Sequence, residues 1–404
     1  MKVLEQKLCH NMGEKIKEKF NEYLLNTYKR IGPVFVKGKG SYLWDINNNK
    51  YLDFFPGWGV SILGHCHPRI VKAITKQAKK LIHLPNNLYS IPQAELAEKI
   101  VKTSFPSKVF FANSGAEAVE GAIKFSRLYG NGKRFEVLTM KNSFHGRTFG
   151  AMSATGQAKY KERFKPILPK FIEVNFNDLE DLKKKYTPKT VAVILELIQG
   201  EGGVNVIDKE FAKGVREFCN EKDLLLIVDE VQTGMGRTSK LYCYQNYNIK
   251  PDIMVLSKGL GAGFPISAFV VRKDITNLIE PGLHASTFGG NPLACFCALE
   301  VFKVIEEEKI LENVSFLGKY IKERLENLAK KTNIIKEIRG LGLMIGIELK
   351  CPSYPIFLEC LNKGLIINST HENVLRIMPA LNVKKEEIDK GLLILEEVIT
   401  NYKC

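Results

Sequence analysis

The chain has 404 residues, which predicts two domains or one large α/β domain with an appendage. Its composition, 45% hydrophobic and 25% charged with a formal net charge of +15, is that of a globular protein rather than a disordered chain. The positive charge could indicate nucleic-acid binding, but lysines alternate with glutamates in stretches such as EKIKEKF, which favours a solvated surface with at most a weak attraction for anionic substrates. No apolar run is long enough to cross a membrane, and the N-terminus lacks the apolar segment of a secretory signal and is too acidic for a transit peptide, so we expect a cytoplasmic protein.

The N-terminal sixty residues predict a helix followed by a hairpin. Within the first thirty residues, Ile16, Phe20 and Leu24 are spaced four apart, as on one face of an amphipathic helix. Residues 40–54 contain two short aromatic runs around an asparagine-rich turn, which is typical of a β-hairpin.

Helical patterns over 68–84 and 92–103 lead into a region, from about 109 to 270, in which short apolar strands alternate with helices. This alternation predicts an α/β fold with a mostly parallel sheet covered by helices on both faces. The predicted strands are KVFFAN, FEVLTM, FIEVNF, VAVILEL, LLLIVDEV, IMVLS and SAFVV.

The pattern changes after residue 290. A long helical stretch over 293–331 precedes three strand-like runs, IKEIRGLGLMIGIEL, GLIIN and VLRIMPAL, and a final helix. This order predicts a smaller α+β domain. The expected organisation is an N-terminal segment over 1–60 that packs with the small domain, a large domain over 61–290 and a C-terminal small domain over 291–404.

The nine cysteines have no disulfide-framework spacing and include no Cys-x-x-Cys, which predicts free thiols in a reducing compartment. His65, Cys66 and His67 follow one another, but adjacent side chains of an extended chain point to opposite faces. No second ligand cluster accompanies them. We therefore expect a turn before a helix here, and no metal site.

Polar residues follow several predicted strands, where ligands of open α/β sheets bind. Ser114, Gly115 and Ala116 open a helix whose free backbone N–H groups could hold a phosphate, although the same residues also suit an ordinary helix cap. In FHGRTFG, Phe144 could stack on a ring, and Arg147 could either bind a carboxylate or lie in a surface turn.

The ends of two later strands carry the strongest signal. Asp229 and Glu230 follow five apolar residues, and a carboxylate there needs a cation: the pyridine nitrogen of pyridoxal phosphate, a structural Arg or Lys, or Mg²⁺. No phosphate loop with Gly-x-x-x-x-Gly-Lys-Ser/Thr spacing occurs, which argues against a nucleotide site. Lys258 ends a strand and precedes three closely spaced glycines. Together, Lys258 and Asp229 predict pyridoxal phosphate more specifically than either residue alone.

Seven motifs in order along nearly the whole chain resemble the class III aminotransferases of pyridoxal-phosphate fold type I, and most closely the acetylornithine aminotransferases. The motifs are NSGAEAVEGAIK, FHGRT, QGEGG, VDEVQTGMGRT, LSKGLGAGFP, STFGGNP and RGLGLMIGIEL. The resemblance implies an enzyme of arginine biosynthesis that transfers the amino group of N-acetylornithine to 2-oxoglutarate. The products would be N-acetylglutamate 5-semialdehyde and glutamate, formed in a ping-pong cycle through pyridoxamine phosphate.

The resemblance also implies roles for individual residues. Lys258 would bind the cofactor as a Schiff base and then move the reacting proton, and Asp229 would keep the pyridine nitrogen protonated. Phe144 would stack on the ring, Val231 would lie beside it and Gln232 would reach the ring hydroxyl.

The same resemblance implies a homodimer with shared active sites. Backbone N–H groups of Gly115 and Ala116 would bind the phosphate together with the partner's Thr287, and Ser286 would lie beside it near the substrate. The other residues expected in the cofactor site are Ser114 and Glu230.

Two arginines would bind substrate carboxylates. Arg147 would bind the α-carboxylate of N-acetylornithine and the γ-carboxylate of glutamate, and Arg376 would bind the α-carboxylate of glutamate. Glu201 would pair with Arg376 whenever the amino donor places no carboxylate there. Trp58 stands where acetylornithine enzymes often carry a smaller apolar residue, so it either narrows the pocket or packs in the interface.

Other interpretations explain fewer of these residues. A basic nucleic-acid-binding protein leaves Asp229 and Lys258 unexplained, and a Schiff-base aldolase barrel explains Lys258 alone. Within the family, Arg147 argues against the glutamate semialdehyde aminomutases. Ornithine, succinylornithine, 4-aminobutyrate and carrier-bound aminoadipate semialdehyde derivatives remain alternative substrates, and the segments NNLYSIPQAELAEKI and STFGGNPLAC favour N-acetylornithine.

Overall fold

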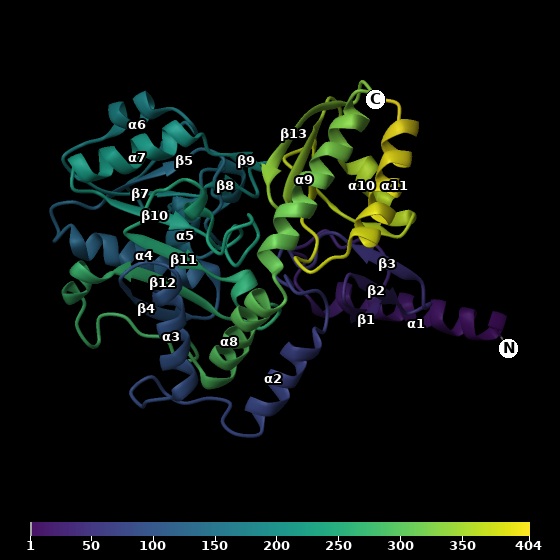
Figure 1. Ribbon diagram of the computed structural model, residues 1–404, viewed down its shortest axis with the longest axis horizontal. Coiled ribbons are helices and arrows are strands. Elements are labelled where there is room, and N and C mark those ends of the chain that lie inside the picture. Colours follow the sequence, from purple (N-terminus) through teal and green to yellow (C-terminus); the bar gives the residue numbers. More distant parts are fainter. Residues whose placement is uncertain (1) are drawn as a thin grey trace.

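A seven-stranded sheet forms the centre of the larger of two lobes (Figure 1), in a computed structural model that describes residues 2–404 and the side chains from residue 12 onward. The strand order is β4-β12-β11-β10-β7-β5-β6. Strand β12 runs antiparallel to both of its neighbours, whereas the other paired strands are parallel. The strands are β4 (Ser107–Ala112), β5 (Glu136–Met140), β6 (Phe171–Val174), β7 (Thr190–Leu195), β10 (Leu225–Asp229), β11 (Ile253–Leu256) and β12 (Ser267–Arg272). The mostly parallel α/β sheet predicted from the alternating pattern is confirmed.

Helices cover both faces of this sheet, which explains why its strands are nearly continuous apolar runs. In β10, Leu225 and Ile227 belong to the core on the side of α4 (Gly115–Tyr129), while Leu226 and Val228 belong to the core that includes α7 (Lys209–Glu221). The other α-helices between residues 60 and 307 are α2 (Pro68–Ala78), α3 (Ile91–Thr103), α5 (Phe149–Ala154), α6 (Leu179–Lys185) and α8 (Pro292–Glu307).

The smaller lobe contains two four-stranded sheets. One has the order β13-β14-β17-β16, and the other joins the N-terminal strands to a C-terminal one in the order β1-β2-β3-β15. Its elements are β1 (Phe35–Lys39), β2 (Tyr42–Asp45), β3 (Lys50–Asp53), α9 (Ile310–Ala329), β13 (Ile335–Leu341), β14 (Met344–Leu349), α10 (Tyr354–Asn362), β15 (Leu365–Ile366), β16 (Asn368–Thr370), β17 (Val374–Ile377) and α11 (Lys385–Asn401). The domain limits expected from the sequence stay a prediction.

The helical stretch expected over 293–331 is broken in two. Lys309 takes a left-handed conformation with φ of 52°, which ends α8 and lets α9 begin at Ile310 in a new direction. The apolar periodicity continues across this break, so the sequence pattern alone did not reveal it.

The N-terminal helix α1 (Lys2–Tyr23) leaves its predicted apolar face largely uncovered. Phe20 is 41% exposed and Leu24, just past the helix, is 48% exposed. Figure 1 shows α1 extending from the body at the N-terminus. An apolar surface of this kind is typical of an interface with another chain.

The prediction of free thiols throughout is wrong for two cysteines, because Cys351 and Cys404 form a disulfide that ties the C-terminus to the segment between β14 and α10. Their separation of 53 residues carries no local signal. Cys9 lies outside the described side chains, and the remaining cysteines are free.

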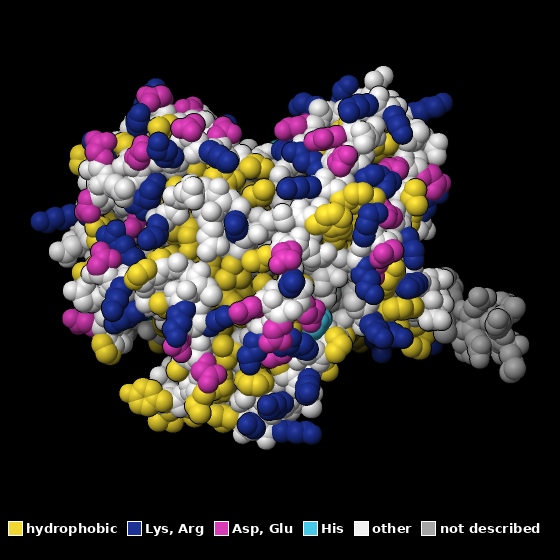
Figure 2. All heavy atoms as spheres, viewed as in Figure 1, with side chains coloured by type: hydrophobic (Ala, Val, Ile, Leu, Met, Phe, Trp, Pro, Cys, Tyr) yellow, Lys and Arg dark blue, Asp and Glu magenta, His cyan; other side chains and the backbone are white. Residues whose placement is uncertain are grey.

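The surface carries mixed charge. Lysine and arginine side chains are spread over the visible face and interspersed with acidic ones (Figure 2). Within residues 2–404, no helix is long and apolar enough to cross a membrane.

Candidate active site

Lys258 lies just beyond the carboxyl end of β11, at the start of a short 3-10 turn. Its amine has no hydrogen-bond or ion-pair partner among the described residues, although the side chain is only partly exposed. Burial lowers the pKa of Lys258 below its usual value, and the negative charges of Glu201 and Asp229 only partly oppose this effect. A lysine in this position is biased toward the neutral, nucleophilic amine.

Asp229 ends the adjacent strand β10 and is nearly fully buried. One carboxylate oxygen accepts a hydrogen bond of 3.0 Å from the backbone N–H of Val231, and the other lies 2.8 Å from Nδ1 of His145. His145 is also buried, and its Nε2 has no partner among the described residues. A buried carboxylate held by an imidazole suits the binding of a protonated ring nitrogen.

A second buried carboxylate, Glu196, lies near this pair. It accepts hydrogen bonds from the backbone N–H groups of Phe144 at 2.9 Å and Gly200 at 3.3 Å. Burial raises the pKa of Glu196 to about 7, against the opposing charge of His145 and with a further contribution from Asp229. Neither Glu196 nor His145 was predicted as a site residue, because the contacts that place them, with Phe144 and Asp229, join segments far apart in the chain.

Arg376 is fully buried on β17 and forms a four-membered polar cluster. Its Nη1 donates to Glu201 Oε1 at 2.8 Å and to Gln232 Oε1 at 3.1 Å. Its Nε and Nη2 donate to Asn368 Oδ1 at 3.1 and 2.9 Å. The ring of Phe55 covers one face of the guanidinium, with its centroid 4.7 Å away. The predicted pairing of Glu201 with Arg376 is therefore present in the structure.

The ionised form of Glu201 is favoured by its neighbours. Burial alone would raise the pKa of this carboxyl, but Arg376 and Lys258 outweigh that effect, so the pKa lies below its usual value. Because Lys258 contributes to this shift, the carboxylate cluster and the lysine belong to one site.

Gln232, which the resemblance assigned to the cofactor hydroxyl, lies at the Arg376 cluster. Its side chain rests against Gly200, where a Cβ atom would come within 1.7 Å of Gln232 Oε1. A side chain at residue 200 would therefore have to displace the Gln232 amide from its position at Arg376. The assignment of Gln232 to the cofactor stays a prediction.

The N-terminus of α4 faces this site through small residues. Ser114 caps the helix by accepting the N–H of Glu117, whose carboxylate in turn accepts the N–H of Ser114. Gly146 has a φ of 141° and packs where a Cβ would lie 2.8 Å from that of Ala116. Gly115 lies against Val231. Close packing around a helix N-terminus leaves backbone N–H groups as the natural donors to an anion.

Arg147 is exposed beside two aromatic rings. Its guanidinium lies 4.1 Å from the ring centroid of Tyr160 and 5.4 Å from that of Phe144. These contacts leave its N–H groups available for a carboxylate, because a ring face accepts the cation without using those donors.

The remaining predicted residues lie around this site. Glu230 faces away from it, because its carboxylate accepts from Thr233 and from the backbone of residues 243 and 244. Trp58 is 49% exposed and contacts the edge of Phe55. Ser286 lies near Asn113, just before α4, and Thr287 is exposed beside it.

These residues fit pyridoxal phosphate. A partnerless lysine amine can bond to its aldehyde, and a buried carboxylate backed by an imidazole can hold its ring nitrogen. The N-terminus of a fifteen-residue helix can bind its phosphate. Residues from the ends of β10 and β11 and from the start of α4 meet at one edge of the sheet, as expected for open α/β folds.

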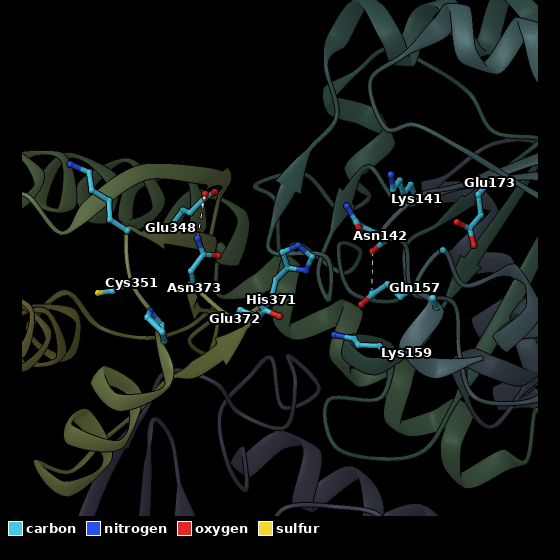
Figure 3. A pocket seen from close by; sticks show the side chains of 14 residues that line it. Lys141, Asn142, Gln157, Lys159, Glu173, Glu348, Cys351, His371, Glu372 and Asn373 are labelled. Carbon is cyan, nitrogen blue, oxygen red and sulfur yellow. Dashed lines mark hydrogen bonds between the residues drawn. The ribbon is translucent and has the colours of Figure 1, made fainter. Parts of the chain in front are cut away.

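A separate groove of about 790 Å³ lies between the two lobes (Figure 3). Asn142, Gln157 and Lys159 line one side, and the turn residues His371 and Glu372 line the other. That turn joins β16 to β17, the strands that carry Asn368 and Arg376. Neither Lys258 nor Asp229 lines this groove, so it is not the site described above.

Comparisons with known proteins agree with this geometry. The sequence model of the family described as aminotransferase class-III matches residues 25–399. The chain is 51% identical to an acetylornithine aminotransferase of Caldanaerobacter subterraneus subsp. tengcongensis, over 95% of this chain and 98% of that protein. It is 48% identical to one of Methanocaldococcus jannaschii, over 95% and 97% of the two chains. Among solved structures, an ornithine aminotransferase of Toxoplasma gondii with partial occupancy of PLP at its active site matches with a TM-score of 0.92 and 33% identity, over 96% of this chain and 94% of that one.

Proposed function

Because this chain belongs to the class-III aminotransferases, we propose that it uses pyridoxal phosphate to transfer the amino group of N-acetylornithine to 2-oxoglutarate. The observation that carries the proposal is the buried Glu201–Arg376 ion pair, since the charge of Lys258 also acts on the Glu201 carboxylate and lowers its pKa. An enzyme that alternates between a donor and a dicarboxylate acceptor needs a carboxylate-binding arginine that can be neutralised in one half of the cycle. The names and identities of the relatives support N-acetylornithine as the donor.

The cofactor would be held by residues from four segments of the large lobe. Lys258 would bond to its aldehyde carbon, and Asp229 would hold a proton on its ring nitrogen. Phe144 would cover the ring, and the backbone of Gly115 and Ala116 would bind the phosphate. When bound, pyridoxal phosphate supplies an electron-withdrawing ring that stabilises negative charge on the substrate carbon.

Lys258 would move the reacting proton. Its lowered pKa favours the neutral amine, so Nζ can accept a proton from the substrate carbon that carries the amino group. Gly259, directly after Lys258, adds no side chain next to the amine-bearing residue. His145 donates to Asp229 and holds its carboxylate in place throughout.

The two substrates would use the arginines differently. Arg147, whose guanidinium packs against the rings of Tyr160 and Phe144, would bind a carboxylate of either substrate. Arg376 would bind only the second carboxylate of glutamate or 2-oxoglutarate. With N-acetylornithine bound, Glu201 would stay on Arg376, which avoids leaving a buried guanidinium unpaired.

We propose that the protein is a homodimer whose sites are completed by the partner's Thr287 and Ser286. In this chain Thr287 is exposed close to the start of α4. The apolar surface around α1 supports a second copy as its occupant, because Tyr23, Leu25 and Tyr28 are each more than half exposed. Sedimentation of the purified protein tests this assembly: a monomer at micromolar concentration contradicts it.

The cytoplasm is the proposed location, in keeping with a biosynthetic role. No nucleic-acid or membrane partner is part of the proposal, and the interspersed surface charges in Figure 2 do not form a basic stripe on the visible face.

A half-reaction on the purified protein tests the function. N-acetylornithine, ornithine, succinylornithine or 4-aminobutyrate is added singly, and the absorption band of the lysine-bound cofactor is followed. Rapid loss of the band with N-acetylornithine, reversed by 2-oxoglutarate, is the expected result. Faster loss with another amine would assign the protein to that substrate, and the absence of any band after addition of pyridoxal phosphate would contradict the cofactor.

A further inference from the structure

We propose that Asn368 is a positioning residue that fixes the orientation of Arg376 and thereby determines how a dicarboxylate substrate is bound. This inference rests on the proposed function, because it concerns the arginine that receives the second carboxylate. Its observation is a single amide oxygen, Asn368 Oδ1, that accepts hydrogen bonds from both Nε and Nη2 of Arg376.

The fold places these two side chains opposite each other. Asn368 on β16 and Arg376 on β17 are directly paired residues of the antiparallel ladder. Side chains that face each other across such a pair lie close enough for direct contact. The hairpin itself is anchored at both strands, because Ser353 Oγ bonds to Ser369 Oγ at 2.7 Å and to the carbonyl of Val374 at 3.3 Å.

The hydrogen bonds of Arg376 show which of its edges is free. A guanidinium has five N–H groups, with one edge formed by Nε and Nη2 and another by Nη1 and Nη2. Asn368 occupies the first edge. Nη1 donates its two hydrogens to Glu201 and Gln232, and Nη2 donates one of its two to Asn368. The other Nη2 hydrogen points to the second edge and has no acceptor among the described residues.

A substrate carboxylate can therefore bind Arg376 only at the Nη1–Nη2 edge. It would take the Nη1 hydrogen released by Glu201 and the free Nη2 hydrogen, which gives a bidentate pair. Phe55 covers one face of the guanidinium, and Asn368 binds its Nε–Nη2 edge. Arg376 therefore keeps this orientation when the Glu201 carboxylate moves away.

Without Asn368, the Nε–Nη2 edge of the guanidinium would have no acceptor to hold it in one orientation. The arginine would rotate about its last bonds, and the Nε–Nη2 edge would compete for the carboxylate in an unproductive orientation. The effect is confined to the substrate that uses Arg376. N-acetylornithine, which we place on Arg147 while Glu201 covers Arg376, should be bound as before.

The test compares Asn368→Leu with the wild-type holoenzyme. We expect the Kd of glutarate, an unreactive five-carbon dicarboxylate, to rise about tenfold in calorimetry, since hydrogen bonds to a charged group are lost. The KM for 2-oxoglutarate should rise by a similar factor, while the KM for N-acetylornithine stays within about twofold.

Asn368→Ser and Asn373→Ser form a matched pair, the first a second test variant and the other its control. Asn373 lies in the same hairpin, and its amide donates to the carbonyl of Leu349 at 3.0 Å rather than to Arg376. If the leucine variant does not fold, Asn368→Ser serves as the second test, because its shorter side chain lacks the amide oxygen that binds both Nε and Nη2. We expect weaker glutarate binding in Asn368→Ser and an unchanged Kd in Asn373→Ser.

Two results would overturn the proposal: a glutarate Kd that does not change in either Asn368 variant, or KM values that rise equally for the two substrates. The glutarate comparison does not depend on which amine is the donor. If the half-reaction assigns the protein to ornithine or 4-aminobutyrate instead, the proposed donor fails while the role of Asn368 is still tested.

Discussion

Replacing Glu201 by glutamine should strengthen dicarboxylate binding, because it removes the group that competes for Arg376. In the wild type the two side chains form a largely buried ion pair at 2.8 Å. At an effective dielectric constant of about 20, unit charges roughly 4 Å apart attract by about 4 kcal/mol, from which the loss of hydration must be subtracted. Hydrogen bonds to charged groups contribute about 1.5–3 kcal/mol net, so glutarate should bind roughly 10- to 100-fold more tightly to Glu201→Gln.

The donor half-reaction should respond in the opposite direction. In Glu201→Gln the uncovered Arg376 would attract the single carboxylate of N-acetylornithine away from Arg147, which lowers kcat/KM for this donor. Stopped-flow half-reactions with each substrate, together with glutarate calorimetry, measure both effects. If both half-reactions and the glutarate Kd are unchanged, the proposed alternation of Arg376 between Glu201 and substrate is refuted.

A stability measurement separates this role from simple loss of an ion pair. Because the pKa of Glu201 is lowered in the folded protein, its pairing stabilises the protein at neutral pH, and this stabilisation disappears as the pH falls through the folded-state pKa, below the usual 4.5. Glu348→Gln is the matched control, since Glu348 pairs with Arg339 on the neighbouring strand and its pKa is lowered to about 2. It should reduce stability at neutral pH without changing the Kd of glutarate.

Four further changes have defined outcomes. Lys258→Ala should abolish the mass increase seen after borohydride reduction with pyridoxal phosphate, and retention of that adduct would place the cofactor on another lysine. Arg147→Gln should raise the KM of both substrates about tenfold or more, in contrast to changes at Arg376, and an effect on one substrate alone would contradict a shared role. Burial raises the pKa of Glu230 to about 7 in the folded protein. The unfolding free energy of the wild type should therefore fall as the pH rises from about 4.5 to 7, because the unfolded chain loses this proton first. Glu230→Gln should make this fall smaller in urea unfolding measured across the same pH range. Cys404→Ser removes the bond to Cys351 and should lower the unfolding free energy of the oxidised protein by about 2–4 kcal/mol, with little difference from wild type once both are reduced.

Much of the large lobe could be predicted because its signals are local. Each strand is a short run of apolar residues, and the rule that ligands bind at the carboxyl ends of parallel strands is enough to place Asp229 and Lys258 together from the sequence. The cap at Ser114 and Glu117 could be read from four consecutive residues. In each case the chemistry lies within one segment, or depends only on the direction of neighbouring strands.

The supporting contacts could not be predicted, since they join segments far apart in the chain. His145 contacts Asp229, which lies 84 residues further along the chain. Within its motif, the sequence pointed to Phe144 and Arg147 as the site residues. Asn368 became visible only through the strand register of its hairpin. The disulfide from Cys351 to Cys404 depends on how α11 returns the C-terminus to the small lobe, which no cysteine spacing encodes.

In the proposed function, the reacting amine and the second carboxylate-binding group lie on different sheets, and this has a consequence for the length of the substrate. Lys258 follows a strand of the seven-stranded sheet, whereas Arg376 belongs to the small sheet of the other lobe. Under that function, the separation of the two lobes would set the carbon-chain length of the dicarboxylate that can bind. Changes in the connection between α8 and α9, or in the β16–β17 hairpin, would reset which dicarboxylate spans the gap while the chemistry at Lys258 stays the same. New acceptor preferences could thus be selected far from the reacting atoms.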